Sequence, residues 1–459
     1  MPPSRRAALL VAGLCLVALA LRLVHANATF DGQLRHVTPG LDRWLYMHIA
    51  TAVARGEWHG GRLAGYESSP AYALLLGLLR RAGGQEWTLA VLVQIGLGAL
   101  APALLFVAGA RLADRRTGMA AAALSAVYGP SIFHEAMLLK FSLLPVVVAG
   151  LLAGCAAAST GTAWAAAGAG VALAALLALR ANAVAVVPVV VLWLTRGVRP
   201  GVVLAALGSG LLVLAVPLGL WRAAAATRGQ QPSLWGIHFY AGNQPEGGGG
   251  YRSVPGVGAD VFGHVDDARA VAEADSGRQL SPGEVSRYWL HRGIAVMRAQ
   301  PLAWLALEGR KVGRLVTPEE EDGIGDDFAG YAQRSPVLRW SLGYGAVLPL
   351  GLIGAAMALA RRAPIAWVAA VGVAYAAALL AFFVTGRYRF PVVPPLLLLA
   401  GYALVSLGDL SKPTAVGIAA AALLAAVGLG APLPQLGWLA ALLAIVPALA
   451  RRATPVVTR

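Results

Sequence analysis

The chain has 459 residues, of which 58% are hydrophobic and 13% are charged. Soluble domains carry nearly twice that share of charged residues, so the composition excludes an ordinary soluble protein and indicates a membrane protein. The net charge of +15 does not indicate nucleic-acid binding, because most basic residues form short clusters between apolar runs, where they set topology and contact anionic lipid.

Twelve apolar runs along the chain are candidates for membrane-spanning helices. The first, residues 7–24, follows a basic pair and has no small-residue cleavage pattern after it, so we expect an uncleaved helix and not a signal peptide. The others cover residues 88–110, 118–133, 138–158, 163–179, 181–194, 202–220, 341–360, 364–384, 390–407, 414–430 and 436–450.

Residues 163–194 are interrupted only by Arg180, so one long helix is the alternative to two in that stretch. Two helices place six basic clusters on the cytoplasmic side, as the positive-inside rule requires: Arg5/Arg6, Arg111/Arg115/Arg116, Arg196/Arg199, Arg361/Arg362, Lys412 and Arg451/Arg452. Merging the two helices would turn all later segments over and break the rule. We therefore predict an all-α polytopic membrane protein with about twelve transmembrane helices and both termini in the cytoplasm.

Two long segments fall outside the membrane in this topology, residues 25–87 and residues 221–340. The acidic residues lie almost entirely in external segments, so we expect the chemistry outside. This divides the chain into three parts. They are an N-terminal transmembrane bundle (1–222) with a functional first external loop (25–87), an external region (223–338), and C-terminal transmembrane helices (339–459).

Both external segments are expected to contain helices. Apolar residues recur at helical spacing over residues 41–53 and again over residues 72–79, which predicts two amphipathic helices in the membrane interface. In the second segment a glycine-rich stretch comes first. A capping pattern at residues 281–284 then predicts a helix to about residue 298, and Pro301 begins another.

Asp42 and Tyr46 are the first candidates for a functional site. On a helix they lie one turn apart on the same face, which puts a carboxylate beside a hydroxyl at the membrane surface. Such a carboxylate can accept a proton from an acceptor hydroxyl. The alternative is that Asp42 only caps the start of its helix.

Further acidic and aromatic candidates stand in two other places. Tyr66 and Glu67 precede the second amphipathic helix, where Glu67 can orient a substrate hydroxyl or hold an ion, or can be a solvated loop carboxylate. Glu135 and Lys140 occupy a short external turn between two spans. Ionisable residues at that depth are costly unless they are paired or functional, so a substrate-binding role and a structural ion pair are both open for Glu135.

Basic residues at two external turns are candidates for binding a lipid phosphate. Arg180 lies at one turn, and Arg387 and Arg389 lie at another. The positive-inside rule disfavours basic residues in such loops, and the guanidinium fork matches phosphate oxygens. With Lys140 they form the predicted donor-phosphate group, and contact with ordinary phospholipid headgroups is the alternative.

These residues resemble motifs of the GT-C superfamily of membrane glycosyltransferases, specifically the bacterial branch similar to the aminoarabinose transferase of lipid A and to protein O-mannosyltransferases. Residues 42–46 resemble the family's first-loop motif, with Asp42 at the position of the catalytic aspartate. Residues 66–70 are similar to its Tyr-Glu-Lys-Pro-Pro motif, although Ser68 stands in place of the lysine that contacts donor phosphate. Residues 387–391 and 238–243 add to the resemblance.

The resemblance implies transfer of a sugar from a polyprenyl-phosphate carrier to a hydroxyl of an acceptor glycan, lipid or protein. Asp42 would be the general base, and the reaction would invert the anomeric centre. The implied location is the periplasmic side of a bacterial inner membrane. We expect no obligatory cofactor or metal, although a divalent ion at Glu67 stays open by analogy. The rivals are a polytopic transporter or lipid-linked-sugar flippase, a glycan polymerase or ligase, and a non-catalytic polyprenyl-phosphate-binding relative.

Overall fold

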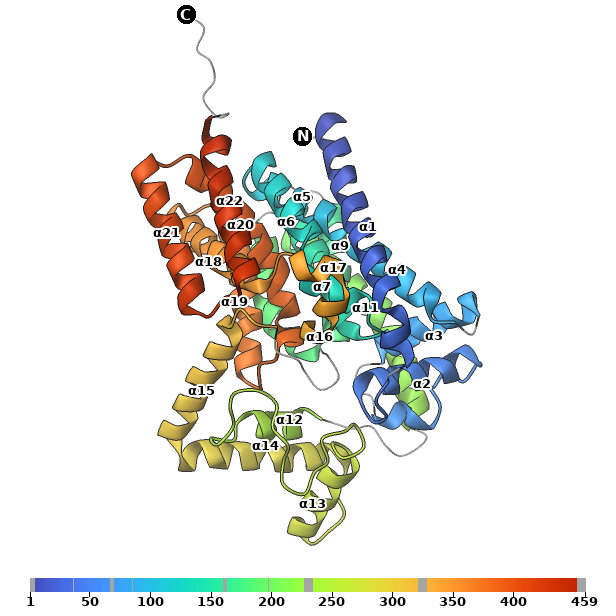
Figure 1. Ribbon diagram of the computed structural model, residues 1–459. Helices are drawn as coiled ribbons and strands as arrows, with labels where there is room; N and C mark the ends of the chain where they lie inside the picture. The colour runs from blue at the N-terminus through green and yellow to red at the C-terminus, as the bar shows by residue number, and fades with distance from the viewer. Residues whose placement is uncertain are drawn as a thin grey trace, which may run out of the picture.

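A computed structural model describes residues 5–35, 37–66, 70–84, 86–159, 163–196, 198–226, 234–320 and 328–451. Throughout these ranges the chain forms helices joined by turns, and the β pairing recorded there is an isolated bridge between Tyr128 and Leu342 (Figure 1). The predicted all-α class is therefore confirmed. It follows from the composition, because a backbone in lipid has to satisfy its own hydrogen bonds.

Apolar helices make up the main bundle. Its N-terminal half contains α1 (Arg5–Arg35), α4 (Thr88–Gly98), α5 (Ala101–Leu112), α6 (Arg115–Ala126), α7 (Gly129–Glu135), η2 (Lys140–Leu143), α8 (Leu144–Ala158), α9 (Ala163–Leu179), η3 (Ala181–Val186), α10 (Val187–Thr195) and α11 (Pro200–Ala226). Its C-terminal half contains α18 (Tyr344–Ala360), α19 (Ala366–Leu380), η4 (Gly386–Val392), α20 (Val393–Gly408), α21 (Lys412–Gly428) and α22 (Leu433–Arg451).

Four of these stretches are long and apolar enough to cross a membrane: Arg5–Thr29, Thr88–Leu112, Lys140–Ala158 and Gly386–Gly408. Seven shorter apolar helices accompany them over the described residues, and the total of about twelve spans stays a prediction. The predicted break at Arg180 is present, since α9 ends at Leu179 and the backbone at Arg180 is extended.

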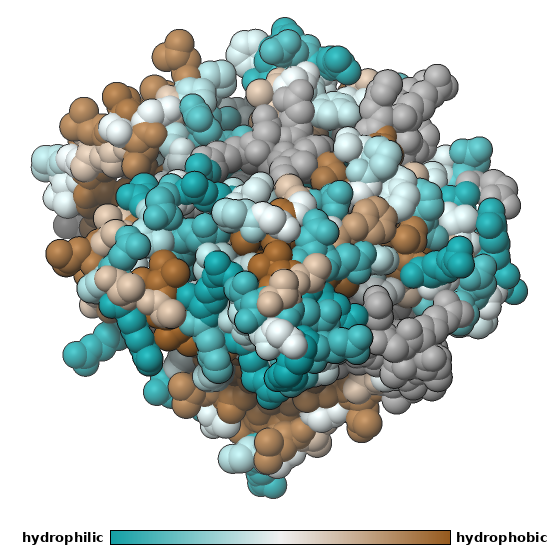
Figure 2. Space-filling model, turned by 90° about the horizontal axis from the view of Figure 1, so that it is seen from below, coloured by the Kyte–Doolittle hydropathy of each residue, from teal (hydrophilic) through white to brown (hydrophobic). Residues whose placement is uncertain are grey.

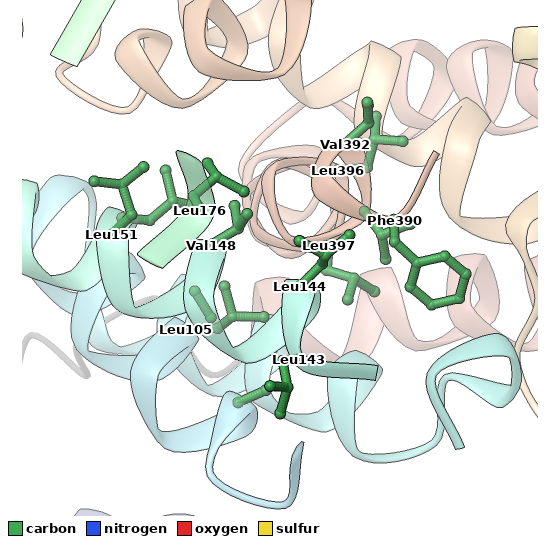
Figure 3. Close-up of a cluster of buried hydrophobic side chains, with 14 of the residues drawn as sticks. Leu105, Leu143, Leu144, Val148, Leu151, Leu176, Phe390, Val392, Leu396 and Leu397 are labelled. Atoms are coloured by element: carbon green, nitrogen blue, oxygen red, sulfur yellow. The ribbon is translucent and has the colours of Figure 1, made fainter. Parts of the chain in front are cut away.

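Helix α20 is the centre of the bundle and is buried from Val393 to Leu407. Figure 3 shows Leu397 of α20 beside Leu144 of α8. Glycines let backbones approach closely here. A Cβ added at Gly354 would lie 1.9 Å from the carbonyl oxygen of Leu399. Close backbone approach at glycine is typical of helix packing in membranes, where lipid tails provide no hydrophobic driving force for helix association.

The predicted external segments gather at one end of the bundle. They contain α2 (Asp42–Ala54), η1 (Arg62–Tyr66), α3 (Ala71–Gly83), α12 (Trp235–Gly242), α13 (Asp266–Ser276), α14 (Pro282–Ala299), α15 (Pro301–Val316), α16 (Phe328–Arg334) and α17 (Pro336–Trp340). Helices α2 and α12 to α14 lie at the lower end of Figure 1, whereas α1 begins and α22 ends at the top. Seen from below, hydrophilic and hydrophobic residues are interspersed over this face, and hydrophobic residues gather along its left and lower margins (Figure 2).

The external region has a small core of its own. Trp289 of α14 is buried among Ile237, Tyr240 and Ala268, and its indole N–H donates to the Ala268 carbonyl at 3.0 Å. The capping pattern at residues 281–284 is confirmed, because Ser281 and Glu284 form a reciprocal capping box at the start of α14. Local sequence signals therefore determine where this helix begins.

Candidate active site

Asp42 is the first residue of α2 and does not cap it. The N-cap is Leu41, which has no side chain able to accept a hydrogen bond, and the chain reaches it through Gly40 at a φ of +80°. The helix-capping interpretation of Asp42 is therefore not supported. The position in the first turn still favours the ionised carboxylate, because the helix N-terminus carries partial positive charge.

Arg387 of η4 forms an ion pair with Asp42. Its Nη2 donates to Oδ2 at 3.2 Å, and the two side chains are 14% and 35% exposed, respectively. The pair joins residues 345 positions apart, so it ties the first external loop to the C-terminal half of the bundle. Both groups remain partly accessible, which a site for an incoming ligand requires.

Two more basic side chains surround this pair on an aromatic platform. The rings of Phe141 and Tyr388 stack with centroids 5.3 Å apart, and the Arg180 guanidinium lies 4.2 Å from the Tyr388 centroid. Lys140 Nζ lies 5.7 Å from the centroid of the Tyr46 ring on α2. The structure thus brings four predicted residues, Asp42, Lys140, Arg180 and Arg387, to one place.

These cations determine the charge state of Asp42. Burial raises the pKa of its carboxyl, but Arg387, Lys140, His238 and Arg180 lower it, and the net pKa is below the ordinary value. The carboxylate is therefore ionised at neutral pH. Among the described residues, this carboxylate therefore lies with three basic side chains, those of Lys140, Arg180 and Arg387.

The external region adds residues that sequence reasoning named only through the family resemblance or missed entirely. His238 of α12 and His264 both interact electrostatically with Asp42. Burial, followed by the influence of His264, lowers the pKa of His238 to about 3. Burial also lowers the pKa of His264. Both rings are neutral at pH 7, and no local motif could have placed His264 beside a residue more than 200 positions earlier.

The other predicted residues of the first loop are Tyr46, Tyr66 and Glu67. Tyr46 is buried, and its ring contacts Tyr72 edge to face at 5.3 Å. The Tyr66 hydroxyl donates to Asp266 at 2.8 Å, which links the loop to the external region. Burial and then this hydrogen bond raise the pKa of Tyr66. Glu67 lies outside the described residues.

Glu135 is paired with Arg22 of α1. Both side chains are 1% exposed, and the guanidinium also donates to the Ala18 carbonyl at 3.1 Å. Gln94 donates from Nε2 to the carbonyl oxygen of Glu135 at 3.2 Å, and its Oε1 accepts from the Tyr72 hydroxyl. The structural ion pair is therefore present, with a partner on α1 that loop spacing did not indicate.

Arg389 is directed away from this cluster despite its place two residues after Arg387. It is 1% exposed and donates to the carbonyl oxygens of Thr317 at 2.6 Å and Glu319 at 2.8 Å. An ion pair with Glu320 at 3.4 Å completes its surroundings. These contacts attach η4 to the segment after α15, and they occupy the guanidinium fork that phosphate binding would need.

Comparisons with known proteins gave distant structural similarity alone. No family model matches the sequence, and no curated protein matches it. Among solved structures, the chain is similar to the archaeal oligosaccharyltransferase AglB from Archaeoglobus fulgidus in complex with an inhibitory peptide and a dolichol-phosphate. The identity is 14% and the TM-score is 0.39, over 94% of this chain and 56% of that one.

The apo form of the Archaeoglobus fulgidus enzyme gives a TM-score of 0.44 at 14% identity, over 95% of this chain and 56% of that one. Its complex with Zn and sulfate gives 0.42 at 15% identity, over 95% and 53%. The chain thus spans about half the length of these structures. TM-scores below 0.5 do not establish a common fold. Among the described residues, no three His, Cys, Asp or Glu side chains are grouped so as to hold a metal ion.

Proposed function

We propose that the chain is a membrane glycosyltransferase that moves a sugar from a polyprenyl-phosphate carrier to an acceptor hydroxyl. The observation that carries this proposal is the ionised Asp42 in contact with Arg387, with Lys140 and Arg180 beside it. A carboxylate suits a general base, and the three basic side chains beside it suit a phosphate. The resemblance of residues 42–46 to the GT-C first-loop motif agrees with this assignment.

The setting fits a lipid substrate. The cluster lies at the end of an apolar helical bundle, beside a face that carries both hydrophilic and hydrophobic residues (Figure 2). A polyprenyl phosphate has a long apolar tail and one charged headgroup, so its tail can stay among lipids while the phosphate reaches Arg387. We place this end of the molecule on the periplasmic side of a bacterial inner membrane.

In this mechanism Arg387 interacts with two anions in turn, the carboxylate of Asp42 and the phosphate of the donor. Without donor it pairs with Asp42, and the incoming phosphate competes for the same guanidinium. Asp42 then takes the proton of the acceptor hydroxyl as its oxygen attacks the anomeric carbon. The bond between that carbon and the phosphate oxygen breaks from the opposite face, which inverts the centre. The leaving phosphate keeps the bonding electrons and is stabilised by Arg387, Arg180 and Lys140.

The other predicted residues take supporting positions in this proposal. Tyr46 and Tyr66 order the first loop against α3 and the external region, and Glu135 holds α7 against α1. Arg389 fastens η4 in place and leaves Arg387 as the residue of that turn that reaches the donor. Phosphate is a good leaving group beside three cations, so the reaction needs no bound metal.

The test is sugar transfer by an Asp42→Asn variant. Asparagine keeps the size of the side chain but cannot take a proton, so transfer from radiolabelled lipid donor should be abolished while expression and donor binding persist. Glu86→Gln, which neutralises an exposed carboxylate of the same loop, is the matched control. An active Asp42→Asn variant removes Asp42 from the role of base. Donor binding without transfer by the wild-type protein would instead favour a flippase.

A further inference from the structure

A loop of the external region, residues 258–266, lies against the start of α2. The backbone N–H of Val261 donates to the carbonyl of Gly40 at 2.9 Å. Next to it, the Phe262 ring meets Trp44 at 5.8 Å and Tyr66 at 4.9 Å, both edge to face. Gly40 precedes Asp42 in the sequence and Trp44 follows it, so these contacts hold the loop close to the Asp42 carboxylate.

The loop presents His264 to a group of polar rings. The His264 Nε2 and the Tyr251 hydroxyl share a hydrogen bond, and the His238 ring lies 5.2 Å from the His264 ring. Both His238 and Tyr251 pack edge to face on Phe383, at 6.1 and 5.4 Å. We call His238, Tyr251 and His264 the neutral polar group. All three are partly exposed.

The neutral polar group is continuous with Lys140, Arg180 and Arg387, which we call the basic cluster. The ring of Phe383, against which His238 and Tyr251 pack, lies 5.4 Å from the Tyr388 ring. The guanidinium of Arg180 in turn lies 4.2 Å from the centroid of the Tyr388 ring. Asp42 interacts electrostatically with members of both groups. Moving outward from the bundle, the surroundings of Asp42 therefore change from three cations to three uncharged hydrogen-bonding side chains.

A sugar phosphate has the same division of chemistry. Its phosphate is charged, and its sugar carries hydroxyl groups that each donate and accept a hydrogen bond. A neutral imidazole offers one donor and one acceptor, and a phenol offers both on one oxygen. Aromatic rings beside them suit the C–H faces of a sugar ring. A second anion would find no cation in this group.

We propose that His238, Tyr251 and His264 bind the hydroxyl groups of a neutral sugar whose anomeric carbon lies near Asp42. The inference rests on the proposed function, in which the basic cluster holds the phosphate. Two sources supply this chemistry, the sugar of the lipid donor and a carbohydrate acceptor. The neutral polar group thereby contributes to sugar specificity, while the basic cluster recognises the lipid phosphate common to all such donors.

The experiment measures binding to purified protein in nanodiscs. The probes are undecaprenyl phosphate alone and undecaprenyl phosphate carrying glucose, mannose or N-acetylglucosamine. The variants are His238→Ala and Tyr251→Phe, and His291→Ala on the exposed side of α14 is the control. Each lost hydrogen bond should weaken binding of the preferred sugar-bearing lipid by about 2- to 10-fold, with binding of the bare lipid unchanged.

Competition identifies the source of the sugar. A methyl glycoside that displaces the sugar-bearing lipid marks the donor's sugar as the occupant, and one that binds beside it with an affinity that falls in the variants marks an acceptor. The inference is overturned if the wild-type protein binds all sugar-bearing lipids no differently from the bare lipid and no glycoside binds. It is also overturned if the variants bind every probe as the wild-type protein does. Failure of the wild-type protein to bind even the bare lipid would refute the proposed function itself.

Discussion

Replacing Arg387 with alanine should weaken binding of a polyprenyl phosphate by about 10- to 150-fold. The range corresponds to roughly 1.5–3 kcal/mol for one hydrogen bond to a charged group. Arg387 is 14% exposed, so its interactions are screened less than those of a surface residue. Lys140 and Arg180 remain beside Asp42 in this variant, which is why we expect weakened binding and not its complete loss.

The measurement is binding of undecaprenyl phosphate to the protein in nanodiscs of uncharged lipid at fixed ionic strength. Arg387→Lys should give an intermediate affinity, because lysine keeps the charge but cannot contact two oxygens with a planar fork. Arg298→Ala, at an exposed position near the end of α14, controls for the loss of one positive charge. Its affinity should match that of the wild-type protein.

Arg389→Ala supplies the sharpest contrast. Its guanidinium is engaged by the carbonyls of Thr317 and Glu319. Loss of these contacts should lower the melting temperature and leave the affinity of the folded fraction near the wild-type value. Wild-type affinity in Arg387→Ala would refute the reasoning. So would a larger loss of affinity in folded Arg389→Ala than in Arg387→Ala.

Three further predictions follow from the same contacts. In Arg387→Ala the pKa of Asp42 should rise because its nearest cation is gone. A base loses activity as the pH falls through its pKa, so the acid limb of the kcat/KM profile should move to higher pH. An acid limb that does not move would contradict this prediction. Glu135→Gln leaves the buried Arg22 without its counter-charge and should cost about 3–5 kcal/mol in thermal or denaturant unfolding, whereas a loss below 1 kcal/mol would contradict the pairing. A cysteine at the exposed Ser253 should react with an impermeant maleimide in intact cells, and reaction only after lysis would overturn the topology.

Much of the helical architecture was predictable because its signals are local. Apolar runs, the Ser281 to Glu284 capping pattern and the interruption at Arg180 each act within a few residues, and the structure has helices or helix ends at all of them. The number of spans is harder to obtain. Kinks and 3₁₀ turns, such as η2 before α8, join or divide apolar runs according to the packing around them.

The site was predictable in its residue types but not in its pairings. Asp42 and Arg387 are separated by 345 positions, and only the folded bundle brings them to 3.2 Å. Sequence also assigned Arg387 and Arg389 the same role, since both stand in one turn. In η4 the two guanidinium groups reach different surroundings, one Asp42 and the other the carbonyls after α15. Spacing alone does not distinguish them.

The pairing of Glu135 with Arg22 is a second contact that the sequence alone did not predict. Arg22 stands near the end of the first apolar run, residues 7–24, where a long side chain can reach the membrane interface on its own. In the structure Gly98 leaves room on α4, since a Cβ there would lie 1.7 Å from a carboxylate oxygen of Glu135. A glycine on one helix thus allows two residues of other helices to meet, which no pairwise sequence rule detects.

The ion pair between Asp42 and Arg387 makes base strength depend on donor binding in the proposed mechanism. A carboxylate whose pKa lies below its ordinary value is a weak base, which would be a poor choice if the cations around it were permanent. In this mechanism a bound phosphate offsets their charge and draws Arg387 away, so the pKa of Asp42 rises when the lipid phosphate is bound. The same exchange disfavours proton removal from water or acceptor before the donor arrives. An arginine shared by base and phosphate therefore orders the two substrates of the proposed mechanism, donor before acceptor.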